Sequence, residues 1–130
     1  MYYAGVSMSF DWSYYLVVAQ ELFENTTDTA HKREANLRCS ISRAYYSTFH
    51  HAKYTLYDKW DILVSESVSA HAQIWNFFKQ KGEKDIAWKL RYMRNARNKA
   101  DYNDQVTNLE NLAKEVLKLA KDVIKELGKL

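Results

Sequence analysis

The sequence predicts an all-α protein, an up-and-down bundle of four to five helices in a single domain over residues 1–130. Three observations lead to this fold class. The 130 residues include no proline and only three glycines, so the usual breakers of long helices are nearly absent. Hydrophobic residues make up 47% and charged residues 27%, a globular composition. Apolar residues also recur at helical spacing along most of the chain.

The first helix is expected from about Ser9 to Glu24, after a short flexible N-terminus over about residues 1–8. Ser9 or Asp11 is placed to cap it. Its apolar residues follow helical spacing: Phe10, Tyr14, Val17, Val18 and Leu22.

The second helix is expected to be long, from about Thr29 to Lys59. Its expected core residues share one sector: Leu37, Ile41, Ala44, Tyr45, Thr48, Phe49, Ala52 and Leu56. Its opposite sector is aromatic and hydrogen-bonding: Cys39, Arg43, Tyr46, His50, Tyr54 and Tyr57. An ordinary exposed face would carry Lys and Glu, so this helix is expected to contact something on both sides.

Three further helices complete the predicted bundle. A loop over Asp61–Ser69 leads to a third helix near Ser69–Lys81, which Gly82 ends. The fourth is expected from about Glu83 to Tyr102, and the fifth from about Gln105 to Leu127. The fifth has nearly a three-four apolar repeat, which fits either packing within the bundle or a dimer seam, and we favour packing within the bundle.

The net charge of +3 is unevenly distributed. Residues 1–30 contain four acidic residues and no Lys or Arg, whereas residues 79–99 contain eight basic residues against two acidic ones. Such a block suits a polyanion such as RNA, although a charge run is more often a solvated helix face.

Several classes of protein are excluded by composition. The apolar runs are too short to span a membrane, and MYYAGVSMSFDW lacks the features of a signal peptide. The single Cys39 permits neither an internal disulfide nor a cysteine-based metal site. We therefore expect a cytoplasmic protein with no membrane contact, no cofactor and no bound metal.

The fourth helix places charged residues on its apolar stripe. Arg97 falls within the stripe, and Arg94 and Asp101 lie at its edge. Asp101 lies one turn from Arg97, so an ion pair is the simplest way to bury this arginine. Spacing alone favours a purely structural pair. The alternative is a pocket in which Arg94 and Arg97 face a phosphate, with Asn98 and Lys99 as further nucleotide- or RNA-binding candidates.

The second helix offers another constellation. Arg43 and His50 lie two turns apart on one face, with Tyr46 beside them. Histidine can act as acid or base and arginine can neutralise a phosphate, so this face could bind RNA or contribute to metal-free cleavage. The alternative is a hydrogen-bonded helix interface. His71, ahead of the third helix's apolar positions, could cap that helix or reach a neighbour.

Three motifs, in order, resemble the HEPN superfamily, small helical proteins of prokaryotic toxin–antitoxin and defence systems. SRAYYSTFHHA at Ser42–Ala52 is similar to the second helix of its short stand-alone members. SAHAQIWNFF at Ser69–Phe78 is similar to their Ser/Thr-His segment, and Arg97–Tyr102 matches an Arg-x-x-Ala-Asp-Tyr motif. The resemblance covers roughly residues 10–127.

The resemblance implies a helical bundle that is usually a symmetric dimer. In active members, an arginine followed after four to six residues by a histidine forms a metal-independent ribonuclease site across the dimer cleft. Here Asp101 and Tyr102 stand where that histidine is expected. The catalytic candidates are therefore Arg94, Arg97, Asp101, Tyr102 and His50.

Two functions follow from the resemblance. The first is a toxin–antitoxin or defence protein that binds RNA or a nucleotide, with metal-independent endoribonuclease activity as its enzymatic form. The second is a non-catalytic module that binds a partner, such as a nucleotidyltransferase, an antitoxin or an effector protein. Both predict a homodimer.

Overall fold

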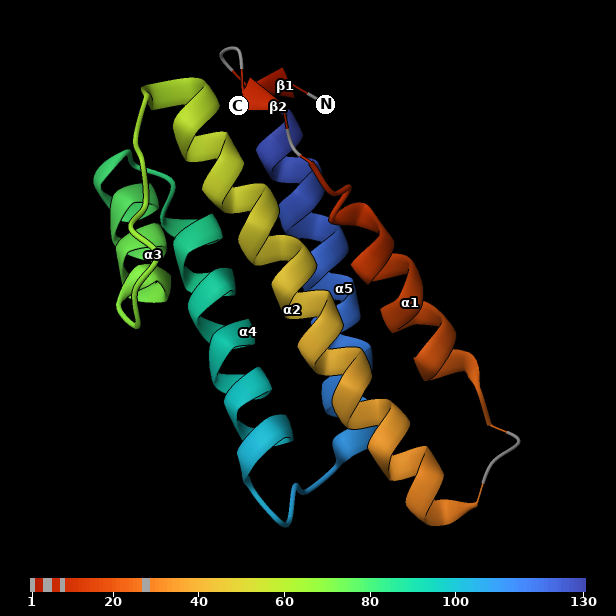
Figure 1. Ribbon diagram of the computed structural model, residues 1–130. Helices are drawn as coiled ribbons and strands as arrows, with labels where there is room; N and C mark the ends of the chain where they lie inside the picture. The colour runs from red at the N-terminus through yellow and green to blue at the C-terminus, as the bar shows by residue number, and fades with distance from the viewer. Residues whose placement is uncertain (1, 4–5, 8, 27–28) are drawn as a thin grey trace.

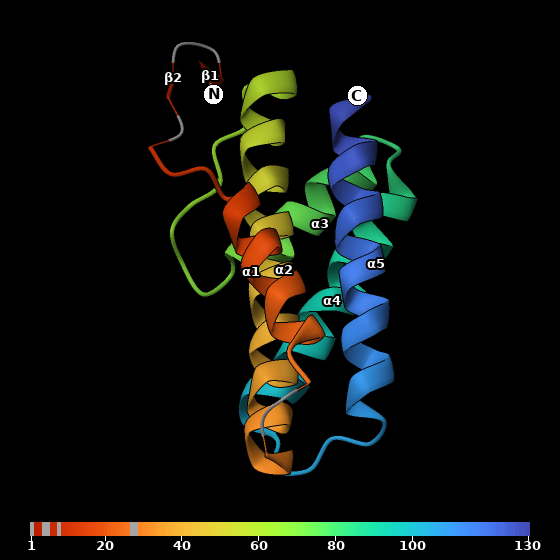
Figure 2. The ribbon, with the colours of Figure 1, turned by 90° about the vertical axis from the view of Figure 1, so that its right-hand side faces the viewer.

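The computed structural model describes residues 2–3, 6–7, 9–26 and 29–130. Within these ranges the chain forms the helices α1 (Ser13–Glu24), α2 (Ala30–Trp60), α3 (Ala70–Gln80), α4 (Lys84–Tyr102) and α5 (Leu109–Gly128). In Figure 1, α1 and α4 run opposite to α2 and α5, which confirms the all-α up-and-down bundle. The long α2 contacts each of the other helices, and α3 packs on α4 (Figures 1 and 2).

A short β pair precedes the helices. Strand β1 (Tyr2–Tyr3) pairs antiparallel with β2 (Val6–Ser7), with Tyr2 opposite Ser7, and β1 contacts α2. The sequence did not predict this pair. The expected flexible N-terminus over about residues 1–8 includes residues 1, 4–5 and 8, which lie outside the described residues.

Local side chains fix the helix ends. Thr29 Oγ1 accepts the Lys32 backbone N–H at 3.3 Å, which starts α2 as predicted. The α1 helix begins at Ser13 rather than Ser9, and an Asp11 carboxylate oxygen accepts the Ser13 N–H at 3.0 Å. Gly82, at φ 82°, makes the left-handed turn between α3 and α4. None of the described helices combines the length and hydrophobicity needed to cross a membrane.

The predicted core of α2 is confirmed. All eight expected residues have at most 9% of their surface exposed, and Ile41, Ala44, Ala52 and Leu56 are completely buried. The helices α3, α4 and α5 also bury apolar residues at helical spacing, among them Ile74, Met93 and Val116. A 3.6-residue period therefore identified the buried face wherever the helix has a broad apolar sector.

The apolar stripe of α1 does not form the core. Phe10, Tyr14, Val17 and Val18 are between 43% and 62% exposed, whereas Ala19 is completely buried. The Ser40 hydroxyl of α2 donates to the Ala19 carbonyl at 2.7 Å. The two helices thus approach closely at these small residues. Leu16 and Phe23 of α1 pack against the core, whereas Tyr14, Val17 and Val18 face outward.

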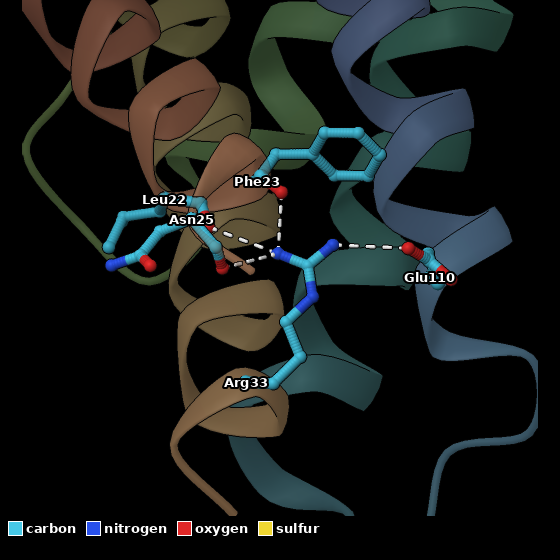
Figure 3. A network of polar contacts seen from close by, with 5 residues as sticks. All are labelled: Leu22, Phe23, Asn25, Arg33 and Glu110. Atoms are coloured by element: carbon cyan, nitrogen blue, oxygen red, sulfur yellow. Dashed lines mark hydrogen bonds and ion pairs between the residues drawn. The ribbon is translucent and has the colours of Figure 1, made fainter. Parts of the chain in front are cut away.

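Two arginines of α2 tie the bundle together through backbone carbonyls. Arg33 donates to the carbonyls of Phe23 at 2.5 Å and Asn25 at 3.0 Å, and its other terminal nitrogen contacts Glu110 of α5 at 3.1 Å (Figure 3). Arg38 donates in the same way to Ala100, Asn103 and Asp104, at 2.9, 2.6 and 2.9 Å. These contacts satisfy the free carbonyls at the C-terminal ends of α1 and α4.

Candidate functional site

Three helices bring polar and aromatic side chains together beside the middle of α2. Tyr45 and Tyr46 come from α2, His71 from the first turn of α3, and Arg94 and Arg97 from α4. Because α3 packs on α4 and both contact α2, a residue at the start of α3 can reach the centre of the bundle. We call these five residues the arginine cluster.

Arg97 is held by the predicted ion pair. Its Nε lies 2.8 Å from Asp101 Oδ2, and the Ser42 hydroxyl donates to the same carboxylate oxygen at 3.4 Å. The Arg97 guanidinium carbon lies 5.1 Å from the centre of the Tyr46 ring and 5.4 Å from that of Tyr102. The ion pair and the two cation–π contacts fix Arg97 between α4 and α2.

The two arginines retain unused hydrogen-bonding capacity. The Nε atoms of Arg94 and Arg97 are both buried and make no hydrogen bond among the described residues. For Arg97, the Asp101 carboxylate is close enough for ion pairing but is not aligned as a hydrogen-bond acceptor. A buried donor without an acceptor costs free energy, so each guanidinium is a candidate to bind an anion.

His71 is the histidine that lies close to these arginines. Its ring stacks on Phe49, with ring centres 4.6 Å apart. Burial, together with the positive charges of Arg94 and Arg97, lowers its pKa from 6.5 to about 4. The imidazole is therefore neutral at pH 7.

Tyr45 determines which nitrogen of His71 carries the proton. The Tyr45 hydroxyl bonds to His71 Nδ1, and only 1% of Tyr45 is exposed. Burial raises the pKa of Tyr45, so its hydroxyl keeps its proton. Because a buried hydroxyl needs an acceptor, we infer that Nδ1 accepts and that Nε2 carries the hydrogen. His71 is then an N–H donor beside two arginines.

His50 also adjoins Tyr46, with ring centres 6.5 Å apart. Its ring stacks on Trp12 with centres 3.5 Å apart and an interplanar angle of 8°. Burial lowers its pKa to about 4, with smaller effects from Lys53, His51 and His71, whereas Arg94 and Arg97 are not among the causes. The histidine that the sequence placed in the site thus stacks on Trp12, which immediately precedes α1, and His71 is the histidine whose pKa the two arginines affect.

Of the other predicted residues, Asn98 and Tyr102 contact Arg97, whereas Arg43 and Lys99 make no contact with the cluster that the structure shows. Arg43 is exposed and lies over the Tyr15 ring of α1 at 5.2 Å. Asn98 accepts a hydrogen bond from Arg97 Nη1 at 3.2 Å and so adjoins the arginine cluster. Lys99 is exposed on the outer side of α4, and Tyr102 is 72% exposed.

A groove of about 540 Å³ opens beside His71. Its lining includes Phe49, His50, Lys53, residues 64–68, Ala70 and His71. A Lys53–Glu66 ion pair of 3.9 Å links its two walls. Its volume falls in the range of small-molecule sites. Among the described residues, no group of three or more His, Cys, Asp or Glu side chains is placed to hold a metal ion.

Sequence reasoning missed the roles of His71 and Tyr45. Tyr45 falls on the predicted core stripe, and nothing in its spacing indicates a hydrogen bond to another helix. For His71, the sequence indicates only that it could cap its helix or reach a neighbour. The signal that could have predicted their contact is the Ser-Ala-His segment, because a side chain in the first turn of a helix can extend past the helix end toward an adjacent element.

Comparison with known protein families shows to which family the chain belongs. A family model for the HEPN domain matches residues 14–130. The chain belongs to the HEPN family. No curated protein and no solved structure matches it.

The HEPN match includes α1 from its second residue, all of α2 to α5, and all three sequence motifs. In this HEPN chain, α4 supplies Arg94, Arg97 and Asp101 to the site, and α3 supplies the neighbouring imidazole. The site therefore combines residues from separate motifs that no single stretch of sequence contains.

Proposed function

We propose that this HEPN protein binds the phosphate groups of RNA or of a nucleotide at the arginine cluster. The observation that carries the proposal is the buried Nε of Arg94, which has no hydrogen-bond acceptor among the described residues, beside Arg97, whose Nε is ion-paired with Asp101. A guanidinium is planar, always charged and suited to bidentate contact with phosphate. A phosphate oxygen would supply the acceptor that Arg94 lacks.

The surrounding residues support an anion rather than a cation as ligand. His71 contributes a third N–H donor, and the Tyr46 ring holds Arg97 in place. Asp101 is the acidic group in direct contact with the cluster, and its charge is offset by Arg97. With His71 neutral, the cluster carries one net positive charge from Arg94 in addition to this pair, which favours a phosphate.

Binding is better supported than cleavage. Metal-free RNA cleavage needs a base to take the ribose 2′-OH proton and an acid to protonate the leaving 5′ oxygen. His50, neutral at pH 7, is the candidate base. His71 is a poor candidate for the acid. If it gave up its Nε2 proton, it would become an imidazolate. If Nδ1 took the Tyr45 proton at the same time, a buried tyrosinate would remain, which the raised pKa of Tyr45 disfavours.

Binding can be tested with uridine monophosphate and a single-stranded RNA in the presence of EDTA. Arg94→Ala should weaken both affinities by roughly tenfold or more, because it removes a charged hydrogen-bond donor. Arg94→Lys should restore only part of the loss, since lysine keeps the charge without the planar fork. Lys114→Ala, an exposed position on α5, is the charge-matched control.

Arg97 separates the functional role from the structural one. Asp101→Asn and Arg97→Ala both remove the ion pair, so both should lower the free energy of unfolding, but only Arg97→Ala should abolish phosphate binding. Wild-type affinity in folded Arg94→Ala and Arg97→Ala variants would contradict the proposal. Cleavage of RNA by wild type, lost in His50→Ala, would establish the nuclease form.

A protein-binding module is the second candidate, and the outward apolar row of α1 favours it. Phe10, Tyr14, Val17 and Val18 are all more than 40% exposed, which is unusual for neighbouring large side chains. This row suits a homodimer or a partner such as a nucleotidyltransferase or antitoxin. Val17→Lys should reduce the mass measured by light scattering if the row forms the dimer, and should leave it unchanged otherwise.

The biological setting is also part of the proposal. A phosphate-binding HEPN protein with an exposed Cys39 fits a reducing, cytoplasmic location and a role in a toxin–antitoxin or defence pair. Co-expression of the gene with its neighbour tests this, because a toxin should arrest growth alone and an antitoxin should relieve that arrest.

A further inference from the structure

The outward face of α4 carries a second group of side chains that the arginine cluster does not use. Lys84, Trp88, Arg91, Asn95 and Lys99 lie at intervals of three or four residues, so they form one row along the helix. All five are exposed. We call this row the α4 strip; at 1.5 Å per residue it is about 22 Å long.

The strip contains a supported aromatic surface. Trp88 is 58% exposed, and its ring stacks on Tyr92 with centres 5.5 Å apart and an interplanar angle of 27°. Burial and a hydrogen bond to Glu115 of α5 raise the pKa of Tyr92, which places its hydroxyl against α5. Tyr92 is therefore anchored and holds the indole in an orientation that leaves most of its surface open.

The charges on the strip are of one sign. Lys84, Arg91 and Lys99 form no ion pair with any described residue. The acidic residue nearest to Trp88 along α4, Asp85, is paired with Lys89 at 2.9 Å. An open indole between unpaired cations is the arrangement that binds single-stranded nucleic acid, in which bases stack and phosphates are neutralised.

We propose that the α4 strip binds a single-stranded oligonucleotide, with a base stacked on Trp88 and phosphates at Arg91 and Lys99. This rests on the proposed function, because the strip extends the phosphate site. Arg91 and Arg94 are three residues apart and so are neighbours on the surface of α4. A strand whose phosphate occupies the arginine cluster can therefore continue onto the strip, which a mononucleotide cannot do.

Charge distinguishes this ligand from a second copy of the chain. A two-fold contact through the strip would place the same cations of both copies opposite one another, which is unfavourable. A single-stranded nucleic acid supplies both the planar rings and the negative charge that this surface complements.

The test compares a fluorescein-labelled oligouridylate of about ten nucleotides with uridine monophosphate. Trp88→Ala should lower the affinity for the oligonucleotide at least about fivefold, which corresponds to the lower end of the free energy of base stacking on an aromatic side chain. Trp88→Phe should retain most of the affinity. Arg91→Ala should reduce the slope of log affinity against log salt by about 0.7. Mononucleotide affinity should not change in either variant.

A matched control accompanies these substitutions. Lys114→Ala removes an exposed cation from α5 and should not alter oligonucleotide affinity. Because Trp88 is exposed, its variants should fold, and circular dichroism verifies this.

The outcomes separate this inference from the proposed function. Two results would overturn binding by the α4 strip while leaving phosphate binding at the arginine cluster intact. One is an unchanged oligonucleotide affinity in Trp88→Ala, and the other is a wild-type affinity no higher for the oligonucleotide than for the mononucleotide. If the wild type binds neither ligand, both proposals are overturned. A fall in self-association in Trp88→Ala, without loss of RNA affinity, would assign the strip to a protein contact and overturn the inference.

Discussion

Lowering the pH from 7.5 to 5.0 should destabilise the protein through His71, and replacing His71 with glutamine should remove that effect. The pKa of His71 is lowered from 6.5 to about 4 in the folded protein, chiefly by burial and also by Arg94 and Arg97 on α4. Between these values the unfolded chain binds a proton that the folded protein does not. The contribution of His71 to the free energy of unfolding is therefore fully present above pH 6.5 and is lost as the pH drops toward 4.

The size of the effect follows from the two pKa values. At pH 5.0 the unfolded histidine is almost fully protonated and the folded one is mostly neutral, which gives an upper limit of about 2 kcal/mol. Because the His71 ring is only partly buried, solvent screening reduces the expected loss to about 1 kcal/mol. His50 should add a loss of the same sign, since burial also lowers its pKa to about 4.

Urea unfolding measured at both pH values provides the assay. The difference in unfolding free energy between pH 7.5 and 5.0 should be about 1 kcal/mol smaller in His71→Gln than in wild type. His31→Gln, at the exposed start of α2, is the matched control and should behave as wild type. An equal pH-dependent loss in wild type and His71→Gln would refute the placement of a neutral His71 beside the arginines.

Three further predictions follow from the contacts. Arg33→Ala should lower the free energy of unfolding by about 2 to 3 kcal/mol, because it leaves helix-end carbonyls unpaired, whereas Glu110→Ala should cost less than about 1 kcal/mol as an exposed ion-pair partner. Arg38→Ala should speed amide hydrogen exchange over residues 98–104, measured by mass spectrometry, more than it does in α1. Phosphate binding should raise the pKa of His71, so calorimetry near pH 5 in buffers of different ionisation enthalpy should detect proton uptake, and His71→Gln should lose it.

The fold was predictable where burial depends on periodicity. The core faces of α2, α4 and α5 follow a 3.6-residue repeat of apolar side chains, and those side chains are buried. For α1, the periodicity indicated an apolar stripe but could not show which side of the helix approaches another helix. Ala19 permits the close approach that places Ser40 against its carbonyl, and the larger Tyr14 and Val17 are excluded from that contact.

The site was predictable only as far as its contacts are local. The Arg97–Asp101 pair joins residues four apart, so helical spacing indicated it. The bond between Tyr45 and His71 joins two helices, and the hydrogen bonds of Arg33 and Arg38 end on backbone carbonyls, which exist at every position. A one-dimensional pattern has no signal for these contacts.

The proton arrangement on His71 decides what this site can do. With Nδ1 accepting from a buried Tyr45, the imidazole presents an N–H donor beside two arginines, and it has no free lone pair with which to deprotonate a ribose hydroxyl. Positions 101 and 102 of α4 carry no histidine, and His71 of α3 does not take over the role of a base there, because its imidazole acts as a hydrogen-bond donor. Asp101, at one of those positions, instead orients Arg97. The same residues that weaken the case for cleavage thus strengthen the case for phosphate binding.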